Sequence, residues 1–313
     1  MEKLVVLVDL HNALYRYYNT QDARIIDGQR VETVSASLNF IRKISEGHFT
    51  DVPDKVIVVS DSDELTFRHY LSPEYKGNRS PMDDELKSQL DLCNQALMAM
   101  GIPHLSKDGV EADDTIGMLS SYYASLGYRV VIVTADKDFY QLINSEIQVY
   151  NPRKKQIIDT DGCIERLMVE PQKVADLLAI MGDKVDNITG VKGAGLKTAA
   201  KWLNEYGSVQ GIILNMNDIG GVVGSNLKES VEHLMTNLSL TKIQNNALFL
   251  TDADHAQIND AHRDEMLVAE LMNKYRFKAL NSDSGQSLGM QNLPPLEAYS
   301  DYVEVDSREF SFF

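Results

Sequence analysis

The sequence is poor in cysteine and contains no long hydrophobic run. Cys93 and Cys163 are the only cysteines in 313 residues, and they form no CxxC pair. The sequence therefore predicts neither a disulfide framework nor a zinc site. No apolar segment approaches the roughly 18 residues that a membrane span needs, and Asp9 breaks the apolar run at the amino terminus. These absences predict a soluble, cytoplasmic monomer without a membrane partner, in the host cytoplasm if the chain comes from a bacteriophage.

Basic residues are also scarce. Lysine and arginine number 30 against 46 aspartates and glutamates, which gives a net charge of -16 and a pI near 4.8. Proteins that bind nucleic acid normally present a positive surface to the phosphates. This composition argues against a polyanion-binding surface spread over the whole protein, and any nucleic acid must bind locally or through metal ions.

The order of apolar segments indicates an α/β protein. Four strand-like runs alternate with stretches of helical periodicity, at residues 4–9, 55–61, 130–136 and 147–150. Such alternation predicts a parallel sheet covered by helices. From about residue 170 the pattern becomes mostly helical, and after residue 280 it becomes polar and proline-interrupted. We therefore expect three parts: an α/β domain at 1–168, a helical lobe at 169–280, and a flexible acidic tail at 281–313.

Aspartates end three of these strand-like runs. Asp9, Asp61 and Asp136 each lie at or just past the carboxyl end of a strand, which is the edge where parallel α/β sheets bind ligands. A single aspartate there is more often a helix cap or a turn residue. Three in equivalent positions favour a functional site.

Further acids lie near these three in the sequence. Asp138 follows in TADKDFYQL, and the stretch GVEADD adds Glu111, Asp113 and Asp114. Glu111 and Asp114 would share a helix face. The acids of GVEADD would also complement the dipole at a helix amino terminus. That role does not explain why they occur together with aspartates at three strand ends.

Seven carboxylates at one sheet edge would raise one another's pKa values unless cations neutralised them. No histidine or cysteine accompanies them at ligand spacing, so the donor set favours Mg²⁺ or Mn²⁺ over zinc. Two such ions about 4 Å apart can activate a water and stabilise the leaving oxygen in phosphodiester cleavage.

Four motifs in order carry a resemblance to a known family. FRHYLSPEYKGNRSP, GVEADD, TADKDFYQL and MGDKVDNITGVKGAGLKTAAKWL resemble the 5′-nuclease family, which includes phage flap endonucleases, 5′→3′ exonucleases and the amino-terminal nuclease domain of bacterial DNA polymerase I. The resemblance covers roughly residues 4–280. It implies a PIN-like parallel-sheet nuclease domain, a helical arch and a helix-two-turn-helix lobe. The spacing between Arg79 and Glu111 leaves room for short arch helices only.

The resemblance also implies two metal sites. The first would contain Asp9, Asp61, Glu111, Asp113 and Asp114, and the second Asp136, Asp138, Asp183 and Asp186. The last two lie in GDKVDN, which by itself indicates only a loop with turn-forming acids.

In the same family pattern, Lys76 and Arg79 would polarise and orient the scissile phosphodiester. Tyr75 would stack on the terminal base, and Arg68 is a further candidate for phosphate contact. Taken alone, these residues would indicate an ordinary basic turn.

The stretch GVKGAGLKTA resembles a P-loop but fails that pattern, because Leu196 separates Gly195 from Lys197 and no strand precedes the motif. By itself it would indicate a glycine helix break with solvated lysines. The family assigns it to the backbone of duplex DNA, often with a K⁺ ion held by loop carbonyls. The DNA-binding candidates here are Lys192, Gly193, Gly195, Lys197, Thr198 and Lys201.

The last five residues, EFSFF, resemble a bacterial sliding-clamp motif through Phe310, Phe312 and Phe313. The tail is therefore a candidate docking peptide for a clamp or a single-strand-binding protein. Packing of the tail on its own domain is the alternative.

Together these patterns predict a metal-dependent nuclease that removes 5′ flaps or primers in DNA replication and leaves a 5′-phosphate. RNA in RNA–DNA hybrids is a further candidate substrate. A PIN-type ribonuclease is one alternative, although it does not account for GVKGAGLKTA. A metal-dependent DNA-binding module without catalysis is another, although binding alone does not need nine carboxylates. A haloacid-dehalogenase phosphatase is disfavoured because position 11 is histidine.

Overall fold

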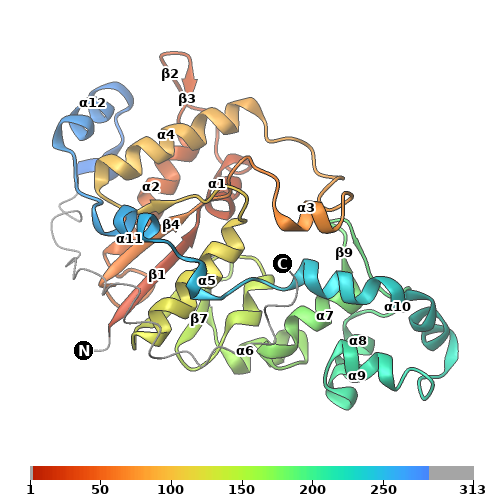
Figure 1. Cartoon of the computed structure of the whole chain (residues 1–313). Helices are drawn as coiled ribbons and strands as arrows, with labels where there is room; N and C mark the ends of the chain where they lie inside the picture. Colours follow the sequence, from red (N-terminus) through yellow and green to blue (C-terminus); the bar gives the residue numbers. More distant parts are fainter. Residues whose placement is uncertain (1–2, 282–313) are drawn as a thin grey trace.

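A six-stranded sheet forms the centre of the molecule. The computed structural model describes residues 3–281, and the strand order is β5-β4-β1-β6-β7-β8 (Figure 1). All neighbouring strands are parallel except β7 and β8. The strands are β1 (Leu4–Asp9), β4 (Lys55–Val59), β5 (His104–Leu105), β6 (Arg129–Val133), β7 (Ile147–Asn151) and β8 (Gln156–Ile158). The predicted α/β class is confirmed, and only the short strands β5 and β8 lacked a signal in the sequence.

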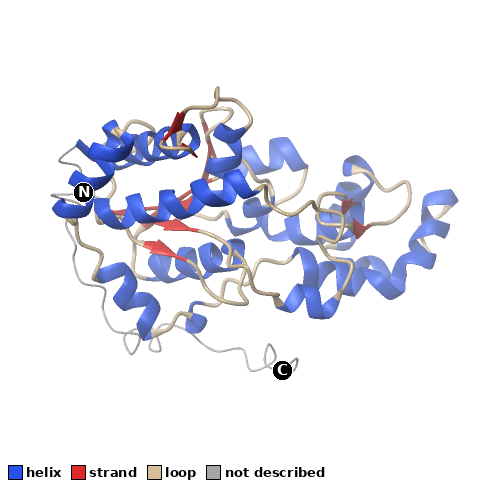
Figure 2. Ribbon diagram, turned by 90° about the horizontal axis from the view of Figure 1, so that it is seen from above, coloured by secondary structure: helices blue, strands red, loops and turns tan. Residues whose placement is uncertain are grey.

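Alternate residues of the strands face two separate hydrophobic cores, as the period of a strand requires. Val6 and Val8 of β1 belong to one core, with the helices α1 (Leu10–Tyr18), α2 (Glu32–Ser45) and α4 (Asp84–Met100). Val5 and Leu7 belong to the other, with α5 (Ala112–Ser125) and α6 (Thr160–Leu167). Figure 2 shows helices on both sides of the strands.

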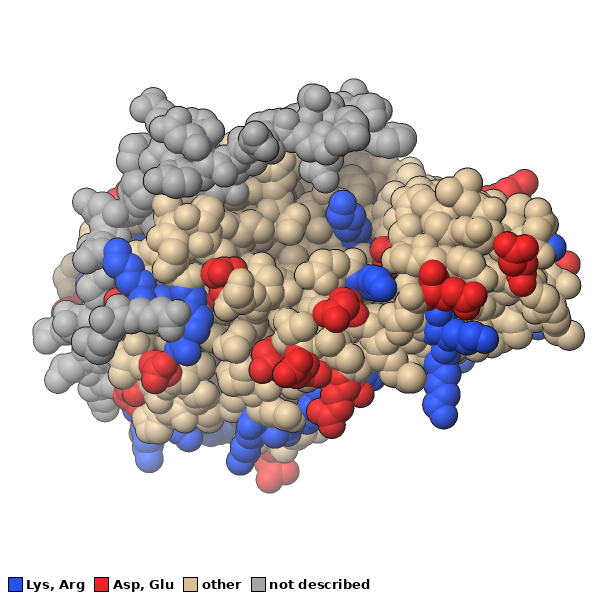
Figure 3. Space-filling view, turned by 90° about the horizontal axis from the view of Figure 1, so that it is seen from below, with Lys and Arg blue, Asp and Glu red and all other residues tan. Residues whose placement is uncertain are grey.

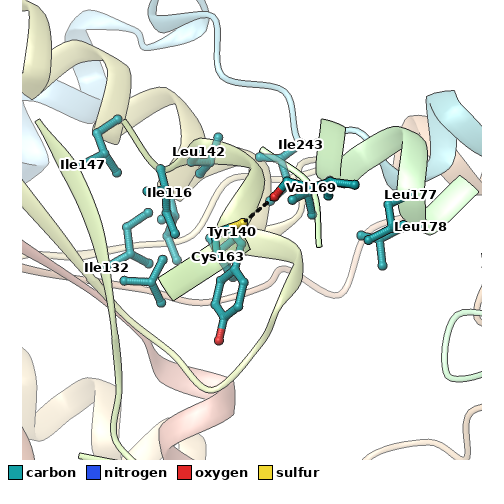
Figure 4. Close-up of a cluster of buried hydrophobic side chains, with 14 of the residues drawn as sticks. Ile116, Ile132, Tyr140, Leu142, Ile147, Cys163, Val169, Leu177, Leu178 and Ile243 are labelled. Carbon is teal, nitrogen blue, oxygen red and sulfur yellow. Dashed lines mark hydrogen bonds between the residues drawn. The ribbon is translucent and has the colours of Figure 1, made fainter. Parts of the chain in front are cut away.

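The helical lobe continues the second core. It consists of α7 (Val174–Met181), the strands β9 (Gly182–Asp183) and β10 (Ile188–Thr189), α8 (Leu196–Tyr206), α9 (Val209–Leu214) and α10 (Gly221–Thr241). Leu177 and Leu178 of α7 lie in one buried cluster with Ile116 of α5 and Ile132 of β6 (Figure 4). The same cluster contains Cys163, whose Sγ lies 3.7 Å from the carbonyl oxygen of Val169. The lobe is therefore fixed to the sheet domain by a continuous apolar core.

The chain returns to the sheet domain after α10. Helix α11 (Asp252–Asn259) lies beside β5, and α12 (Glu265–Tyr275) packs on α4 (Figure 1). Val268 and Leu271 of α12 are buried in the same core as α1 and α2. The predicted lobe at 169–280 is thus wrong in its last part, because apolar residues of the final segment bury against the sheet domain.

A long connection joins β4 to α4 and contains the short helix α3 (Phe67–Leu71). Between Arg79 and Glu111, 17 residues belong to α4, which packs against α2 and α12. Leu86, Leu92 and Cys93 are buried along its length, which holds α4 against the domain.

Smaller elements complete the described chain. They are β2 (Ile25–Ile26), β3 (Gln29–Arg30) and the 3-10 turns η1 (Asp138–Leu142), η2 (Pro171–Lys173), η3 (Ala247–Phe249) and η4 (Lys278–Asn281). No helix within residues 3–281 is long and apolar enough to cross a membrane. The proposed clamp-binding residues Phe310, Phe312 and Phe313 lie outside the described residues.

We expect Gly190 to be essential for the junction between α7 and the β9–β10 hairpin. A Cβ at this position would lie 2.3 Å from both the nitrogen of Gly182 and the carbonyl carbon of Met181. Because both contacts are backbone atoms, Gly190→Ala must push the hairpin apart and should lower the free energy of unfolding by about 1–3 kcal/mol. Urea unfolding measures the change.

Gly195→Ala is the matched control. The same methyl group would meet nothing within 4 Å there, so only a smaller loss from the N-cap position of α8 is expected. Equal destabilisation by the two variants would contradict the steric explanation.

Candidate metal centre

Asp9, Asp61 and Asp136 meet at the carboxyl edge of three adjacent strands, β4, β1 and β6. Asp9 ends β1 and caps α1: its Oδ1 accepts from the backbone nitrogen of Asn12 at 3.0 Å, and its Oδ2 accepts from the hydroxyl of Thr134 at 3.1 Å. Asp61 Oδ1 accepts from the nitrogen of Ala112 at 2.8 Å, at the start of α5. The sheet register brings the three acids to one edge, and these bonds fix the side chains of Asp9 and Asp61 there.

The acids at this edge repel one another. Burial raises the pKa of Asp9 to about 7, and the charges of Asp61 and Asp136 add to this effect. Asp113, in the first turn of α5, has a pKa raised well above its usual range by burial and by the charges of Asp136, Asp9 and Asp61. The four carboxylates thus form one electrostatic group, in which burial and mutual repulsion outweigh the positive charge of Lys76.

A second group lies beside the first and shares Asp136. Burial raises the pKa of Asp138 well above its usual range. The negative charge of Asp136 is the next cause, and the charges of Asp183 and Asp186 act in the same direction. Asp138 Oδ1 is buried and has no hydrogen-bond partner among the described residues. The β9–β10 hairpin of the helical lobe supplies Asp183 and Asp186, so residues from both parts of the chain meet here.

Glu111 is the most heavily paired acid of the site. Its Oε1 accepts from Lys76 Nζ at 2.8 Å, and its Oε2 accepts from Arg68 at 3.0 Å. The hydroxyl of Tyr75 lies 3.2 Å from both Glu111 Oε2 and Asp186 Oδ2, and can donate to one at a time. Burial disfavours the Lys76 charge, but Glu111 and Asp186 outweigh it and raise the pKa of Lys76.

Asp114 pairs with Arg68 rather than turning toward the other acids. Two guanidinium nitrogens donate to its two oxygens at 2.6 and 2.8 Å, and both side chains are 2% exposed. The structure therefore contradicts the prediction of Arg68 as a phosphate contact. Tyr75 is only 3% exposed, so its ring is not open to a stacking base either.

Two further cations border the site. Arg79 forms an ion pair with Asp186 and remains 46% exposed. Lys137 Nζ lies 3.4 Å from Asp183 Oδ2. A cavity opens between these elements, lined by Glu111, Asp113, Asp138, Asp183 and Asp186 and walled by the end of α10 at Leu240 and Thr241.

The glycine-rich stretch lies between β10 and α8 in the helical lobe. Gly193 has a φ of +84°, which glycine adopts without strain, and Gly195 is the N-cap residue of α8. Lys192, Lys197 and Lys201 are exposed, Thr198 is half-buried, and none of the three lysines has an ion-pair partner within the described chain. On the face shown in Figure 3, basic and acidic side chains are interspersed and form no single positive field.

The residues of the edge fit hard divalent cations in charge and donor type. All the donors are carboxylate oxygens, one of them an unpartnered buried atom, and burial and the neighbouring acids raise the pKa values of Asp9 and Asp113. In residues 3–281, however, no three acidic, histidine or cysteine side chains have the geometry of a formed metal site. Closing a coordination shell therefore requires the carboxylates to turn toward the ion.

Sequence reasoning missed the residues that hold the acids in place. Asn12, Thr134 and Lys137 lie within three residues of a predicted acid, so their position was a usable signal. The backbone nitrogen of Gln244 donates to Asp114 at 2.8 Å. The two residues are 130 positions apart, so the sequence contains no signal of this contact. His11 accepts from the nitrogen of Asp61 at 3.3 Å, and this bond supports a structural role.

Comparison with known proteins agrees with this architecture. The model of the 5′-3′ exonuclease N-terminal resolvase-like domain matches residues 4–168, and the model of the 5′-3′ exonuclease C-terminal SAM fold matches residues 169–264. DNA polymerase I of Mycobacterium tuberculosis is 30% identical over 297 residues, which are 94% of this chain and 33% of the polymerase. The chain thus spans about a third of the length of the polymerases that it matches.

A 5′-3′ exonuclease of Aquifex aeolicus is 37% identical over 181 residues, which are 58% of this chain and 63% of that protein. Among solved structures, the bacteriophage T5 D15 flap endonuclease in complex with DNA and metal ions has a TM-score of 0.65 at 23% identity, covering 88% of this chain and 99% of that chain. At this identity the likeness supports the fold.

The family models and the ordered motifs agree, and the chain belongs to the 5′-3′ exonuclease family, whose members are nucleases that hydrolyse phosphodiester bonds.

Proposed function

We propose that the chain is a metal-dependent nuclease that cuts DNA at 5′ ends and 5′ flap junctions. The observation that carries the proposal is the pair of carboxylate groups that share Asp136 at the sheet edge, with two cationic side chains, Lys76 and Arg79, at their rim. Such an arrangement can hold two divalent ions and a phosphodiester together. RNA in RNA–DNA hybrids is included as a substrate class.

Mg²⁺ or Mn²⁺ is the proposed cofactor. Asp9, Asp61, Asp113 and Asp136 would hold one ion, and Asp136, Asp138 and Asp183 a second. When bound, the ions lower the pKa of a water and stabilise the leaving oxygen. Glu111, Asp114 and Asp186 are already paired with Lys76, Arg68 and Arg79, and we assign them to positioning these cations.

Lys76 and Arg79 are the proposed phosphate-orienting residues. The segment that carries them is tied to the β9–β10 hairpin, because the nitrogen of Lys76 donates to the carbonyl of Asp186 at 3.0 Å and the side chain of Asn78 donates to the carbonyl of Lys184 at 2.6 Å. Their placement is therefore fixed before substrate arrives, which is what electrostatic catalysis needs.

The exposed lysines of the glycine-rich stretch are proposed to contact the backbone of duplex DNA. Free backbone N–H groups before a helix and three lysines without ion-pair partners suit phosphate, and such contacts carry no sequence information. A K⁺ ion at the loop carbonyls belongs to the same proposal. For the tail we propose a sliding clamp or a single-strand-binding protein as partner, acting in DNA replication in the cytoplasm.

Asp136→Asn tests the central carboxylate. We expect cleavage of a 5′-labelled flap substrate in Mg²⁺ to be abolished, since both ions would lose a shared ligand. The metal-free variant should unfold at a temperature higher by about 2 °C or more, because one repelling charge has gone while the acceptor for the nitrogen of Asp138 is kept. A folded variant that cleaves at full rate would overturn the assignment.

Lys76→Ala tests the phosphate-orienting role. Turnover should fall about 10²- to 10³-fold, as for the loss of one preorganised electrostatic group, while the dissociation constant for flap DNA stays within about threefold. Lys87→Ala is the control, because Lys87 pairs with Asp63 on exposed surface. If turnover and affinity for flap DNA fell by the same factor, Lys76 would contribute to binding alone.

The raised pKa of Asp9 predicts how metal ions and pH act on stability. A buried carboxyl whose pKa rises from 3.8 to about 7 on folding binds its proton more tightly when folded. Without divalent ions, stability should therefore fall as pH rises from about 4 and level off above about 7. Mg²⁺ should raise the unfolding temperature more at pH 8 than at pH 5, measured by calorimetry. A larger effect at pH 5 would contradict a carboxylate site.

A further inference from the structure

Arg68 has an unusual set of partners for an ion-paired residue. Its Nε donates to the carbonyl of Leu240 at 2.8 Å, and one terminal nitrogen donates to the carbonyl of Lys242 at 2.8 Å. The remaining donors reach Asp114 and Glu111. These are five hydrogen bonds for the five donors of a guanidinium. Burial disfavours the Arg68 charge, but the bonds to Asp114 and the charge of Glu111 outweigh it and raise the pKa of Arg68.

The two carbonyls belong to the carboxyl end of α10, a helix of 21 residues. Carbonyls there have no intrahelical partner and carry the negative end of the helix dipole. Arg68 thus caps α10 with a buried positive charge. Through Glu111, the same guanidinium is one side chain away from Lys76 Nζ.

The other end of α10 touches the glycine-rich stretch. Asn226 donates to the carbonyl of Lys192 at 2.8 Å. Farther along, Asn237 donates to the carbonyls of Ala179 and Thr189, at 3.1 and 2.8 Å. Helix α10 is therefore tied both to the proposed duplex-binding loop and, through Arg68, to the carboxylate that holds Lys76.

We propose that Arg68 is a positioning residue that fixes the end of α10, and with it the duplex-binding lobe, in register with Glu111 and Lys76. Arg68 acts through Glu111 and does not contact the substrate. The proposal rests on the proposed nuclease function for its kinetic consequence only.

The test uses the double variant Arg68→Met/Asp114→Asn. Removing Arg68 alone would leave a buried, unpaired Asp114, which is strongly destabilising. The double variant removes both charges and keeps the side-chain stem and the acceptor for the nitrogen of Gln244. Lys107→Met/Asp254→Asn is the matched control, because this pair is also largely buried and Lys107 also donates to a backbone carbonyl, that of Phe249.

Two measurements decide the proposal on folded protein. In Mg²⁺, the double variant should cleave flap DNA about 10²-fold more slowly in a single turnover, as misplaced catalytic groups do, with its dissociation constant within about threefold. Without DNA, hydrogen exchange in residues 72–80 should become faster in the double variant and stay unchanged in the control pair.

The outcomes separate the two proposals. A double variant with wild-type cleavage rate, or with unchanged exchange at 72–80, would show that Arg68 is a structural ion pair only. Loss of binding in proportion to rate would overturn positioning in favour of affinity. If the wild-type protein fails to cleave flap DNA, the proposed function fails, and the exchange measurement still decides the role of Arg68.

Discussion

Repulsion among buried carboxylates is the constraint on which the site depends. Six of the acids fall into two classes, which differ in whether a cationic side chain neutralises them. Glu111, Asp114 and Asp186 are neutralised by cationic side chains, whereas Asp9, Asp113 and Asp138 keep raised pKa values because burial and their neighbours disfavour the charge. In the second class, burial and repulsion outweigh the charges of Lys76 and Lys137. This imbalance is what favours the proposed placement of the divalent ions at these acids.

The helical lobe is part of this site rather than an attachment to it. Asp183 and Asp186 enter through the β9–β10 hairpin, and Leu240 and Thr241 of α10 form one wall of the cavity. The core shared by α5 and α7 fixes the lobe to the sheet domain. The final segment, α11 and α12, then returns to the sheet domain. Because the chain enters and leaves the lobe through packed segments, the lobe has little freedom to move as an independent unit.

The sequence predicted those features that depend on local pattern and strand periodicity. The strand ends at Asp9, Asp61 and Asp136 and the helix start at GVEADD follow from alternation and from the geometry of parallel sheets. Asp183 and Asp186 came only from the family resemblance, because a turn of acids has no periodic signal. Arg68 was misread, since burial by the end of α10 depends on a contact across 172 residues. The placement of α11 and α12 was missed for the same reason. The apolar pattern of a helix predicts that one face is buried, but it does not predict which core that face joins.

The acidic surface has a consequence for how DNA can approach. With a net charge of -16, the protein as a whole repels phosphate, and at physiological salt this repulsion is screened beyond about 8 Å. In the proposed function, DNA must therefore come close before the exposed lysines at 192, 197 and 201 can act. Those lysines lie on the lobe, whereas the sheet edge would attract phosphate only with divalent ions bound to its carboxylates. The proposed attachment and cleavage thus use different charges, and the contact proposed to keep the two in register is the end of α10 at Arg68.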